Sequence, residues 1–421
     1  MWFNRRGGGA RFLLFLLAAA ALSACLEPEI SCADVLGCVE VRANETIRIA
    51  ALLPMSGGGV PLGTLARGGI DLAIADRGDS MLNHQIELTL YDSACRPDTA
   101  QAAADVIAAD SRVVGVVGTI CADAARPAAA RLSSAGLTMI SPANSASDLT
   151  DPDSRRPGYF RTAVSLTAQG QAAARFAFNE LSARSAAIIY DNSEYADELQ
   201  TAFVATFQNL GGSITYRSRR QIELTTVAGL LNSVKLGRPE VLYLPLFAPE
   251  AGLLVNKIQE VPDLAATAVL GPDSLFLPEF ALSAGSATAG MYVSGAAVSG
   301  PDYEDFLARW EVQFGQRPAA ADALIAPFAY DAANLLFTAV EQAAQVDSAG
   351  RLLIGRAALR QALTDMKPML GLTGSLACDT FGDCAAGTAV GIYQFSEAEA
   401  RGEQWPPLLV WPPPGRDDAA R

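Results

Sequence analysis

The side chains that could do chemistry gather where apolar runs end. After the run LTMI at 137–140, the segment SPANSASD at 141–148 brings together hydroxyls, an amide and an acid. Another loop, GPDSLF at 271–276, places Asp273 directly after a second apolar run. Hydroxyls and a lone carboxylate hold a small polar molecule by hydrogen bonds and charge. These loops predict ligand binding and offer few of the combinations that catalysis needs.

The motifs of common enzymes are missing from the sequence. It contains no GxxxxGK[ST], GxSxG or HExxH pattern, and His84 is its one histidine, so a hydrolase that relies on a histidine base has a single candidate. The glycine-rich segment at 55–63 lacks GxGxxG and a basic residue, which argues against a phosphate loop. The segment CDTFGDC at 378–384 lacks the spacing of a calcium loop and favours a disulfide-closed turn. The sequence predicts no enzyme, no cofactor and no metal site.

Length and charge narrow the class of protein. The 421 residues suit two domains, each large enough to bury its own core. Removing residues 1–24 with their three arginines leaves 28 basic against 45 acidic residues, so the formal charge falls from -14 to -17. Such a chain is repelled by phosphate backbones. We therefore expect a folded protein that has no nucleic acid partner.

Residues 1–24 have the composition of an export signal. Basic residues precede the eleven-residue apolar run at 12–22, which is too short to cross a bilayer but fits a secretory signal peptide. The segment LSAC at 22–25 resembles a bacterial lipoprotein signal, in which Cys25 is lipidated; an ordinary signal peptide with a chance cysteine is the alternative. With no later apolar run long enough to span, we expect an exported protein that Cys25 anchors to a membrane, facing the periplasm or cell exterior. Residues 25–45 would be a lipidated leader that links the anchor to the folded body.

The other six cysteines are an even number in an oxidising compartment, where fifteen pairings are open. Two pairs six residues apart would close small loops: Cys32 with Cys38, and Cys378 with Cys384. Cys95 and Cys121 each follow a predicted strand, at 86–92 and 113–120. If those strands are parallel neighbours, both cysteines lie at one sheet edge within reach of a disulfide. Metal ligation is disfavoured because no CxxC occurs, and His84, beside a turn, is predicted to lie at the surface.

Short apolar strands alternate with alanine-rich helices along most of the chain. Strands are predicted at 47–54, 86–92, 113–120, 137–141, 186–191, 213–218, 241–247, 267–271 and 290–296. Helices are predicted at 99–110, 126–135, 167–181 and 195–210, then at 303–314, 325–344 and 356–366. Continuous apolar strands separated by helices indicate a parallel sheet covered on both faces, a doubly wound α/β fold. A strand-like segment at 389–395 precedes a Pro-rich tail at 406–421, which we expect to be extended and poorly packed.

The order of these segments resembles the type I periplasmic solute-binding proteins, specifically the branched-chain amino acid (Leu/Ile/Val-binding) group of ABC importers. Seven segments carry the resemblance, in order: IRIAALLPMSG, YDSACRPDTAQAAADVI, GVVGTICADAARPAAARLSSAGLTMISPANSASDLT, GYFRTAVSLTAQG, AAIIYDNSEYADEL, AVLGPDSLF and GMYVSG. They cover roughly residues 46 to 395, most of the mature chain.

The resemblance implies two α/β lobes joined by three crossing strands, with the ligand enclosed as the lobes hinge shut. The first lobe would contain 46–163 and about 294–388, and the second 164–293 and about 389–405. The crossings would fall near 161–164, 292–295 and 371–390. The pair Cys95 and Cys121 matches the family's disulfide in the first lobe.

The resemblance also implies a set of ligand contacts. The ligand carboxylate would meet Ser145 and backbone N–H groups, with Ala122 standing where the family has a second serine. The ammonium would meet the Ala143 carbonyl and the acid Asp273. Tyr195 would reach in from the second lobe, and Leu62 and Phe247 stand where the family has aromatic residues lining the site.

Two departures from the family pattern bear on the ligand. Ala122 lacks the serine hydroxyl, and the acidic Asp123 follows it, so either Asp123 caps its helix and points away or the ligand is not a simple α-amino acid. Asp273 is one methylene shorter than the family's usual glutamate. Simpler roles are also open, because Ser145 could be a helix N-cap and Asp273 a turn acid.

The sequence as a whole predicts a lipid-anchored solute-binding protein. It would capture a small polar molecule, an aliphatic or other neutral amino acid, and deliver it to the permease of an ABC importer. Two alternatives remain open at this point. One is a sensing receptor of the same fold that does not transport, and the other is a structural envelope lipoprotein.

Overall fold

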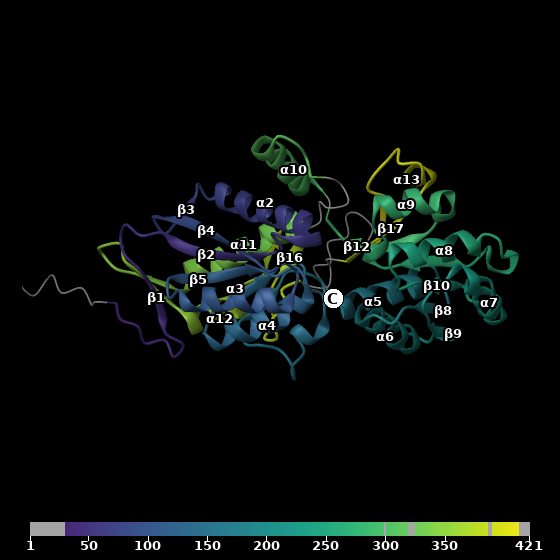
Figure 1. Ribbon diagram of the computed structural model, residues 1–421, viewed down its shortest axis with the longest axis horizontal. Coiled ribbons are helices and arrows are strands. Elements are labelled where there is room, and N and C mark those ends of the chain that lie inside the picture. The colour runs from purple at the N-terminus through teal and green to yellow at the C-terminus, as the bar shows by residue number, and fades with distance from the viewer. Residues whose placement is uncertain (1–29, 299, 319–324, 386–389, 412–421) are drawn as a thin grey trace, which may run out of the picture.

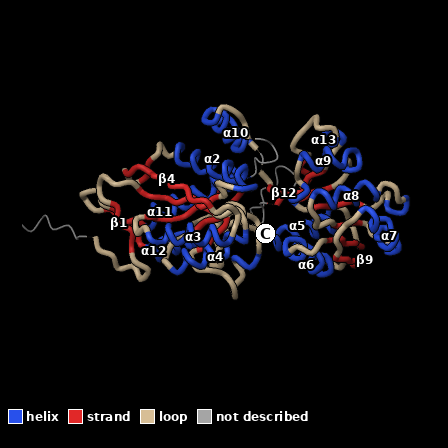
Figure 2. Tube along the Cα trace, viewed as in Figure 1, coloured by secondary structure: helices blue, strands red, loops and turns tan. Residues whose placement is uncertain are grey.

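The computed structural model describes residues 30–298, 300–318, 325–385 and 390–411. The predicted signal peptide at 1–24 and Cys25 lie outside these residues. Figure 1 shows two α/β bodies side by side, which we call the first lobe and the second lobe after the sheets on which they are built. Figure 2 shows that helices flank the strands in both lobes, so the predicted α/β class is confirmed.

The first lobe is built on a six-stranded sheet with the order β3-β4-β2-β5-β6-β7. Its strands are β2 (Ile47–Leu53), β3 (Ser80–Met81), β4 (His84–Asp92), β5 (Val113–Gly118), β6 (Met139–Ser141) and β7 (Tyr159–Arg161). Every neighbouring pair is parallel except the short β3–β4 pair. The carboxyl ends of the parallel strands therefore meet at one edge, where ligand loops of such sheets lie.

Helices cover both faces of the first sheet because β2 is apolar on both faces. Ile49 and Ala51 pack with residues of α2 (Val60–Asp76), α11 (Ile325–Ala343) and α12 (Arg356–Asp365). Ala50 and Leu52 pack on the opposite side with α3 (Pro97–Ala109) and α4 (Ala122–Ser134). This is the alternation expected of a strand buried on both sides.

The second lobe is built on a seven-stranded sheet with the order β18-β17-β12-β11-β10-β8-β9. Its strands are β8 (Ser185–Tyr190), β9 (Ser213–Arg219), β10 (Val241–Tyr243), β11 (Ala268–Gly271), β12 (Tyr292–Ala296), β17 (Val390–Gln394) and β18 (Leu408–Trp411). The first five are parallel, and β17 and β18 add an antiparallel edge.

Helices cover both faces of the second sheet as well. Ala186 and Ile188 pack with α5 (Leu166–Arg175) and α6 (Glu194–Asn209). Ala187 and Ile189 pack on the other face with α7 (Leu224–Val234), α8 (Ala248–Ile258) and α9 (Pro278–Ala284). A single π-helical turn, Phe176–Glu180, ends the predicted helix at 167–181.

Three connections join the lobes. The first runs from β7, which ends at Arg161, to α5, which begins at Leu166. The second runs from β12 to α10 (Pro301–Phe314), so the boundary predicted at 294 falls inside β12, a strand of the second sheet. The third follows the hairpin of β15 (Met369–Gly371) and β16 (Gly374–Leu376) and leads to β17. Residues 386–389 of that connection lie outside the described residues.

Two segments pack more than the sequence predicts. The leader contains β1 (Cys38–Val41), which pairs with β14 (Leu352–Gly355), itself paired with β13 (Ala344–Val346). Its last part is therefore a strand of the fold and not a linker. In the Pro-rich tail, β18 pairs with β17 at the edge of the second sheet, so at least 408–411 are packed. Residues 412–421 lie outside the described range.

The prediction that His84 lies at the surface is wrong. His84 is 3% exposed, and its two ring nitrogens lie 2.8 Å from the carbonyl oxygens of Glu45 and Gly350. The turn before β4 is covered by the segment ahead of β2 and by the turn between β13 and β14. Because those segments were not recognised as part of the fold, nothing in the sequence suggested that they would bury the ring.

The structure pairs the cysteines as Cys32–Cys38, Cys95–Cys121 and Cys378–Cys384. The condition on which the Cys95–Cys121 pairing was expected, that the strands before them are neighbours, is not met, because β2 lies between β4 and β5. The Cys95–Cys121 disulfide instead passes over the carboxyl end of β2, with a Cα–Cα distance of 5.3 Å. Over the described residues, no helix is long and apolar enough to span a membrane.

Candidate functional site

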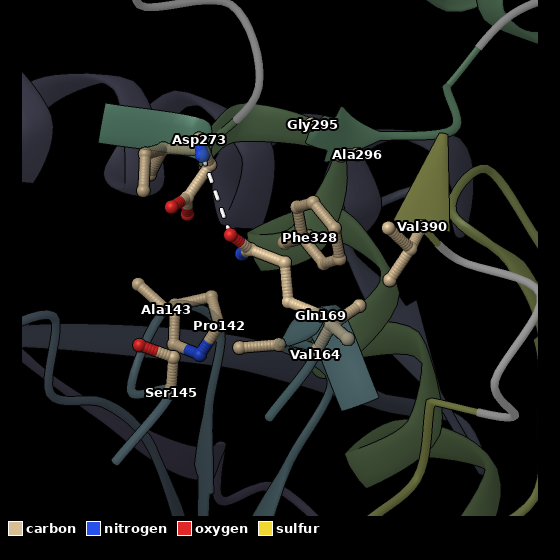
Figure 3. Close-up of a pocket in the computed structure, with 12 residues that line it drawn as sticks. Pro142, Ala143, Ser145, Val164, Gln169, Asp273, Gly295, Ala296, Phe328 and Val390 are labelled. Carbon is tan, nitrogen blue, oxygen red and sulfur yellow. Dashed lines mark hydrogen bonds between the residues drawn. The ribbon is translucent and has the colours of Figure 1, made fainter. Parts of the chain in front are cut away.

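A cavity of about 150 Å³ lies between the lobes, against their connections (Figure 3). Ala163 and Val164 come from the first connection, Gly295 and Ala296 end β12, where the second connection begins, and Val390 begins β17, where the third ends. The remaining lining residues are Pro142, Ala143, Ser145, Gln169, Asp273, Ile325 and Phe328. A molecule in this cavity would touch both lobes and the hinge at once.

The first-lobe wall is the loop after β6. Ser141 shapes it, because its hydroxyl oxygen accepts the N–H groups of Ala143 and Asn144 at 3.3 and 3.0 Å and donates to the Thr119 carbonyl at 2.7 Å. The Ser145 carbonyl accepts the N–H of Leu166 at 3.0 Å, which ties this loop to the start of α5. The Ala143 N–H is thus engaged within the loop.

The second-lobe wall is the turn after β11, which begins with Asp273. The Tyr195 hydroxyl donates to the Asp273 carboxylate and accepts the Ser274 N–H at 3.2 Å. Phe247 stacks on the Tyr195 ring with centroids 5.3 Å apart. Figure 3 shows Asp273 across the cavity from Ala143 and Ser145. Asp273 is therefore held by the Tyr195 hydroxyl, and Phe247 packs against the Tyr195 ring.

The electrostatics of the cavity favour a cation. Asp273 opens into the cleft on one side, while protein atoms crowd it on the others; that desolvation raises the pKa of its carboxyl, and the hydrogen bond from Tyr195 opposes the rise. Burial holds the pKa of Tyr195 well above its ordinary value, so this hydroxyl stays protonated and donates. None of the lining residues, all within the described ranges, is Lys, Arg or His. An ammonium group would supply the missing counter-charge.

Binding of an amine ligand is expected to weaken as the pH falls. The ammonium stays charged through the acidic range, whereas Asp273 takes up a proton as the pH drops through its raised pKa. Affinity should therefore decline at a higher pH than an ordinary aspartate near pKa ~3.9 would give. Calorimetric titrations between about pH 4 and 7 would measure this. An affinity that stays flat over the range would contradict either the raised pKa of Asp273 in the unliganded protein or its contact with the ammonium.

The structure brings three of the predicted contacts together and separates the others. Ala143, Ser145 and Asp273 line the same cavity. Tyr195 touches Asp273 without lining the cavity, and Phe247 stacks on Tyr195 with its side chain 44% exposed. Two others pack against first-lobe core clusters and are not lining residues: Leu62 in α2 and Ala122 in α4.

The acid that departs from the family pattern, Asp123, does not line the cavity. Asp123 lies in the first turn of α4, 73% exposed, and pairs with Arg126 at 2.7 Å. Ser145 does not cap a helix, because the short 3-10 turn that follows it, Ser147–Leu149, has Ala146 at its N-cap position. The structure thus removes one objection to an amino acid ligand and the simplest alternative role of Ser145.

Gln169 lines the cavity and was missed from the sequence. Its side-chain oxygen accepts the Asp273 N–H at 3.3 Å and the Ser294 hydroxyl at 3.1 Å (Figure 3 draws the first of these). Gln169 is a buried amide in the first turns of α5, directly after a lobe connection. A polar residue at that position, within an otherwise apolar helix face, was the available signal.

The two lobes also touch each other outside the lining of the cavity. Arg126 of α4, bonded to Asp148 at 2.8 Å, reaches Glu194 of α6 at 3.0 Å. The Ser147 N–H donates to Glu198 of the same helix at 3.0 Å. The loop that carries Ser145 is therefore in contact with the second lobe.

The comparisons with known proteins agree with this architecture. The chain is 27% identical over 254 residues to the leucine-, isoleucine-, valine-, threonine- and alanine-binding protein of Pseudomonas aeruginosa. The aligned part covers 59% of this chain and 66% of that relative, slightly less than two thirds of the relative's length. It superposes on a leucine-binding protein from Thermotoga maritima with a TM-score of 0.65 and 22% identity, over 83% of this chain and 96% of that one. It also superposes on an ABC transporter solute-binding protein from Rhodopseudomonas palustris in complex with 3,4-dihydroxybenzoic acid, with a TM-score of 0.64 and 22% identity, over 83% and 93%.

The predicted type I periplasmic binding fold is thus confirmed by solved structures. Residues 46–402 match the family of periplasmic binding proteins, a span that includes all three connections and every strand of the two lobe sheets except β18. The chain belongs to the periplasmic binding protein family.

Proposed function

We propose that this protein captures a small molecule that carries an ammonium group, an aliphatic or other neutral amino acid, and delivers it to an ABC importer. The single observation that carries the proposal is Asp273, an acid without a basic partner among the cavity's lining residues, facing Ala143 and Ser145 across the cleft. An ammonium at Asp273 and a carboxylate near Ser145 would span the distance between the lobes.

The rest of the cavity supports an apolar ligand side chain. Its walls include Pro142, Val164, Ile325, Phe328 and Val390. Burying an aliphatic side chain among such groups contributes about 25 cal/mol for each Å² removed from water. The Pseudomonas aeruginosa relative is named for leucine, isoleucine and valine, which is consistent with this chemistry.

An aromatic acid is the competing ligand class, because the Rhodopseudomonas palustris protein holds 3,4-dihydroxybenzoic acid. A benzoate has a carboxylate and no ammonium. Placed in this cavity it would meet Asp273 and no basic lining residue, so the two negative charges would repel each other. We therefore favour the amino acid.

Ligand capture would work by hinge closure. A ligand that contacts Asp273 of the second lobe and Ser145 of the first stabilises the state in which both walls are near, and so shifts the population toward closure. The contacts of Arg126 with Glu194 and of Ser147 with Glu198 already join the two lobes. Export with Cys25 as lipid anchor remains part of the proposal, tested by partition of the full chain between membrane and soluble fractions.

A thermal-shift series built on leucine tests the ligand class. Leucine is compared with 3-methylbutan-1-amine, which lacks its carboxylate, with 4-methylpentanoate, which lacks its ammonium, and with 3,4-dihydroxybenzoate. We expect leucine to stabilise the protein most and the amine to stabilise it less, while neither acid stabilises it. A ligand at 100 times its dissociation constant should add about 2.7 kcal/mol to the free energy of unfolding. Stabilisation by the acids and not by leucine would overturn the proposal.

An uptake measurement in cells distinguishes a transport function from a sensing function. A sensing receptor of the same fold would bind the same ligand. Uptake of the radiolabelled ligand by a strain lacking this chain should fall if the protein delivers it to an importer, and stay normal if it only reports its presence.

A further inference from the structure

Arg161 is a fully buried cation beside the loop that carries Ser145. It ends β7, is 0% exposed, and its guanidinium reaches three residues of the loop that carries Ser145. One terminal nitrogen donates to the carbonyl oxygens of Asn144 and Ala146, at 3.2 and 2.6 Å. The other donates to the Thr150 hydroxyl at 2.6 Å. One side chain thus holds the loop on both sides of Ser145.

The counter-charge of Arg161 comes from a distant part of the chain. Its Nε pairs with the carboxylate of Asp383, which also accepts the Thr150 hydroxyl at 3.2 Å. The backbones pair as well, because the Arg161 N–H donates to the Gly382 carbonyl and the Cys384 N–H donates to the Arg161 carbonyl, both at 2.9 Å. The segment 378–384 is therefore docked directly onto Arg161.

The docked segment has a preset shape. The disulfide Cys378–Cys384 closes it, and one carboxylate oxygen of Asp379 accepts the N–H groups of Phe381, Gly382 and Asp383 at 2.8 to 3.0 Å. Gly382 has φ of +108°, and a Cβ there would lie 2.3 Å from the Tyr159 carbonyl oxygen. Only glycine permits so close a contact with β7. The disulfide and the Asp379 hydrogen bonds thus fix the shape of the loop and the position of Asp383 in it.

A buried guanidinium needs this partner. An unpaired charge in a protein interior is strongly unfavourable, and removal of one member of a buried pair leaves the other without compensation. Without Asp383, Arg161 would keep only neutral acceptors and would be drawn toward water. The carbonyls of Asn144 and Ala146 would then lose the donor that fixes their positions.

We propose that the disulfide-closed loop 378–384 is a positioning element of the ligand site. It holds Asp383 against Arg161, and Arg161 holds the loop of Ala143 and Ser145 in its binding conformation. Ligand affinity then depends on the Cys378–Cys384 disulfide, although neither cysteine lines the cavity. This inference rests on the proposed function in one respect, namely that the 143–145 loop contacts the ligand.

The chain supplies a matched control for the test. Cys32–Cys38 and Cys378–Cys384 each join cysteines six residues apart, so their removal frees loops of the same length. Cys32–Cys38 lies in the leader, next to β1. We expect Cys378→Ala/Cys384→Ala to weaken leucine binding about 10-fold to 100-fold and Cys32→Ala/Cys38→Ala to leave it unchanged. Hydrogen exchange of the amides at 144–150 should accelerate in the first variant alone.

Asp383→Asn keeps the test decisive if the first double variant does not fold. It removes the charge and preserves the loop, so the same acceleration at 144–150 and the same weaker binding are expected. Normal exchange at 144–150 in folded Asp383→Asn, or equal effects of the two cysteine variants, would overturn the inference. If the unaltered protein binds no ligand of the leucine series, the proposed function fails while hydrogen exchange still tests the positioning role.

Discussion

Asp273→Asn is expected to weaken leucine binding by about 2 to 5 kcal/mol, roughly 30-fold to a few thousandfold. The substitution keeps the size of the side chain and an oxygen that can accept from the Tyr195 hydroxyl. It removes the negative charge, and none of the other lining residues is acidic. The loss should therefore appear as charge recognition, measured by titration calorimetry against leucine and 3-methylbutan-1-amine.

Asp263→Asn is the matched control for that measurement. Asp263 and Asp273 each follow a proline and lie in a three-residue 3-10 turn of the second lobe. Asp263 differs in that it does not line the cavity and lies 3.7 Å from Lys235. We expect its substitution to leave binding and stability nearly unchanged, as for most exposed ion pairs. Equal affinities of the two variants for leucine would remove Asp273 from the site.

The α/β fold was predictable because buried parallel strands leave a strong trace in the sequence. Strands such as β2 and β5 are apolar at nearly every position, since helices cover both sides. The leader has no such run, and the apolar run of β18, LLVW, is only four residues long and is flanked by prolines. β1 and β18 are four-residue strands whose pairing depends on partners far along the chain, and local sequence carries no information about those partners.

The candidate site was predictable in part for a related reason. Ala143, Ser145 and Asp273 follow strand ends, and the carboxyl edge of a parallel sheet gathers such loops wherever they occur in the sequence. Leu62 and Ala122 also lie near strand ends, but helix packing turns them to the core. Which side of a helix faces a cleft depends on how the lobes are placed, and this was not encoded in the local pattern.

Supporting residues were the hardest to foresee. Arg161 and Asp383 are 222 positions apart, and each would pass as a surface charge in isolation. Their pairing becomes meaningful once the third connection brings segment 378–384 back to β7. The same holds for Gln169, whose partners Asp273 and Ser294 lie on the turn after β11 and on β12.

Gln169→Leu is expected to cost about 1 to 3 kcal/mol of leucine affinity, since Asp273 would lose its backbone anchor. The leucine has a similar volume but no oxygen, so the Asp273 N–H would lose its acceptor. The fully buried Ser294 hydroxyl would keep only the Gly271 carbonyl oxygen, 3.5 Å away. The turn that carries the acid would then relax away from the hinge. Titration calorimetry measures the affinity, and denaturant unfolding measures any loss of stability beside it.

Two further variants distinguish the loss of the Gln169 acceptor oxygen from the general effect of replacing a glutamine by leucine in α5. Gln169→Glu retains an acceptor oxygen and should preserve the turn, while its added charge beside Asp273 should move the loss of binding to higher pH. Gln171→Leu, two positions along α5, removes an amide that accepts from Arg175 of the same helix and should bind leucine normally. If Gln169→Leu bound leucine as tightly as Gln171→Leu, the position of Asp273 would have to be fixed by Tyr195 and the turn itself.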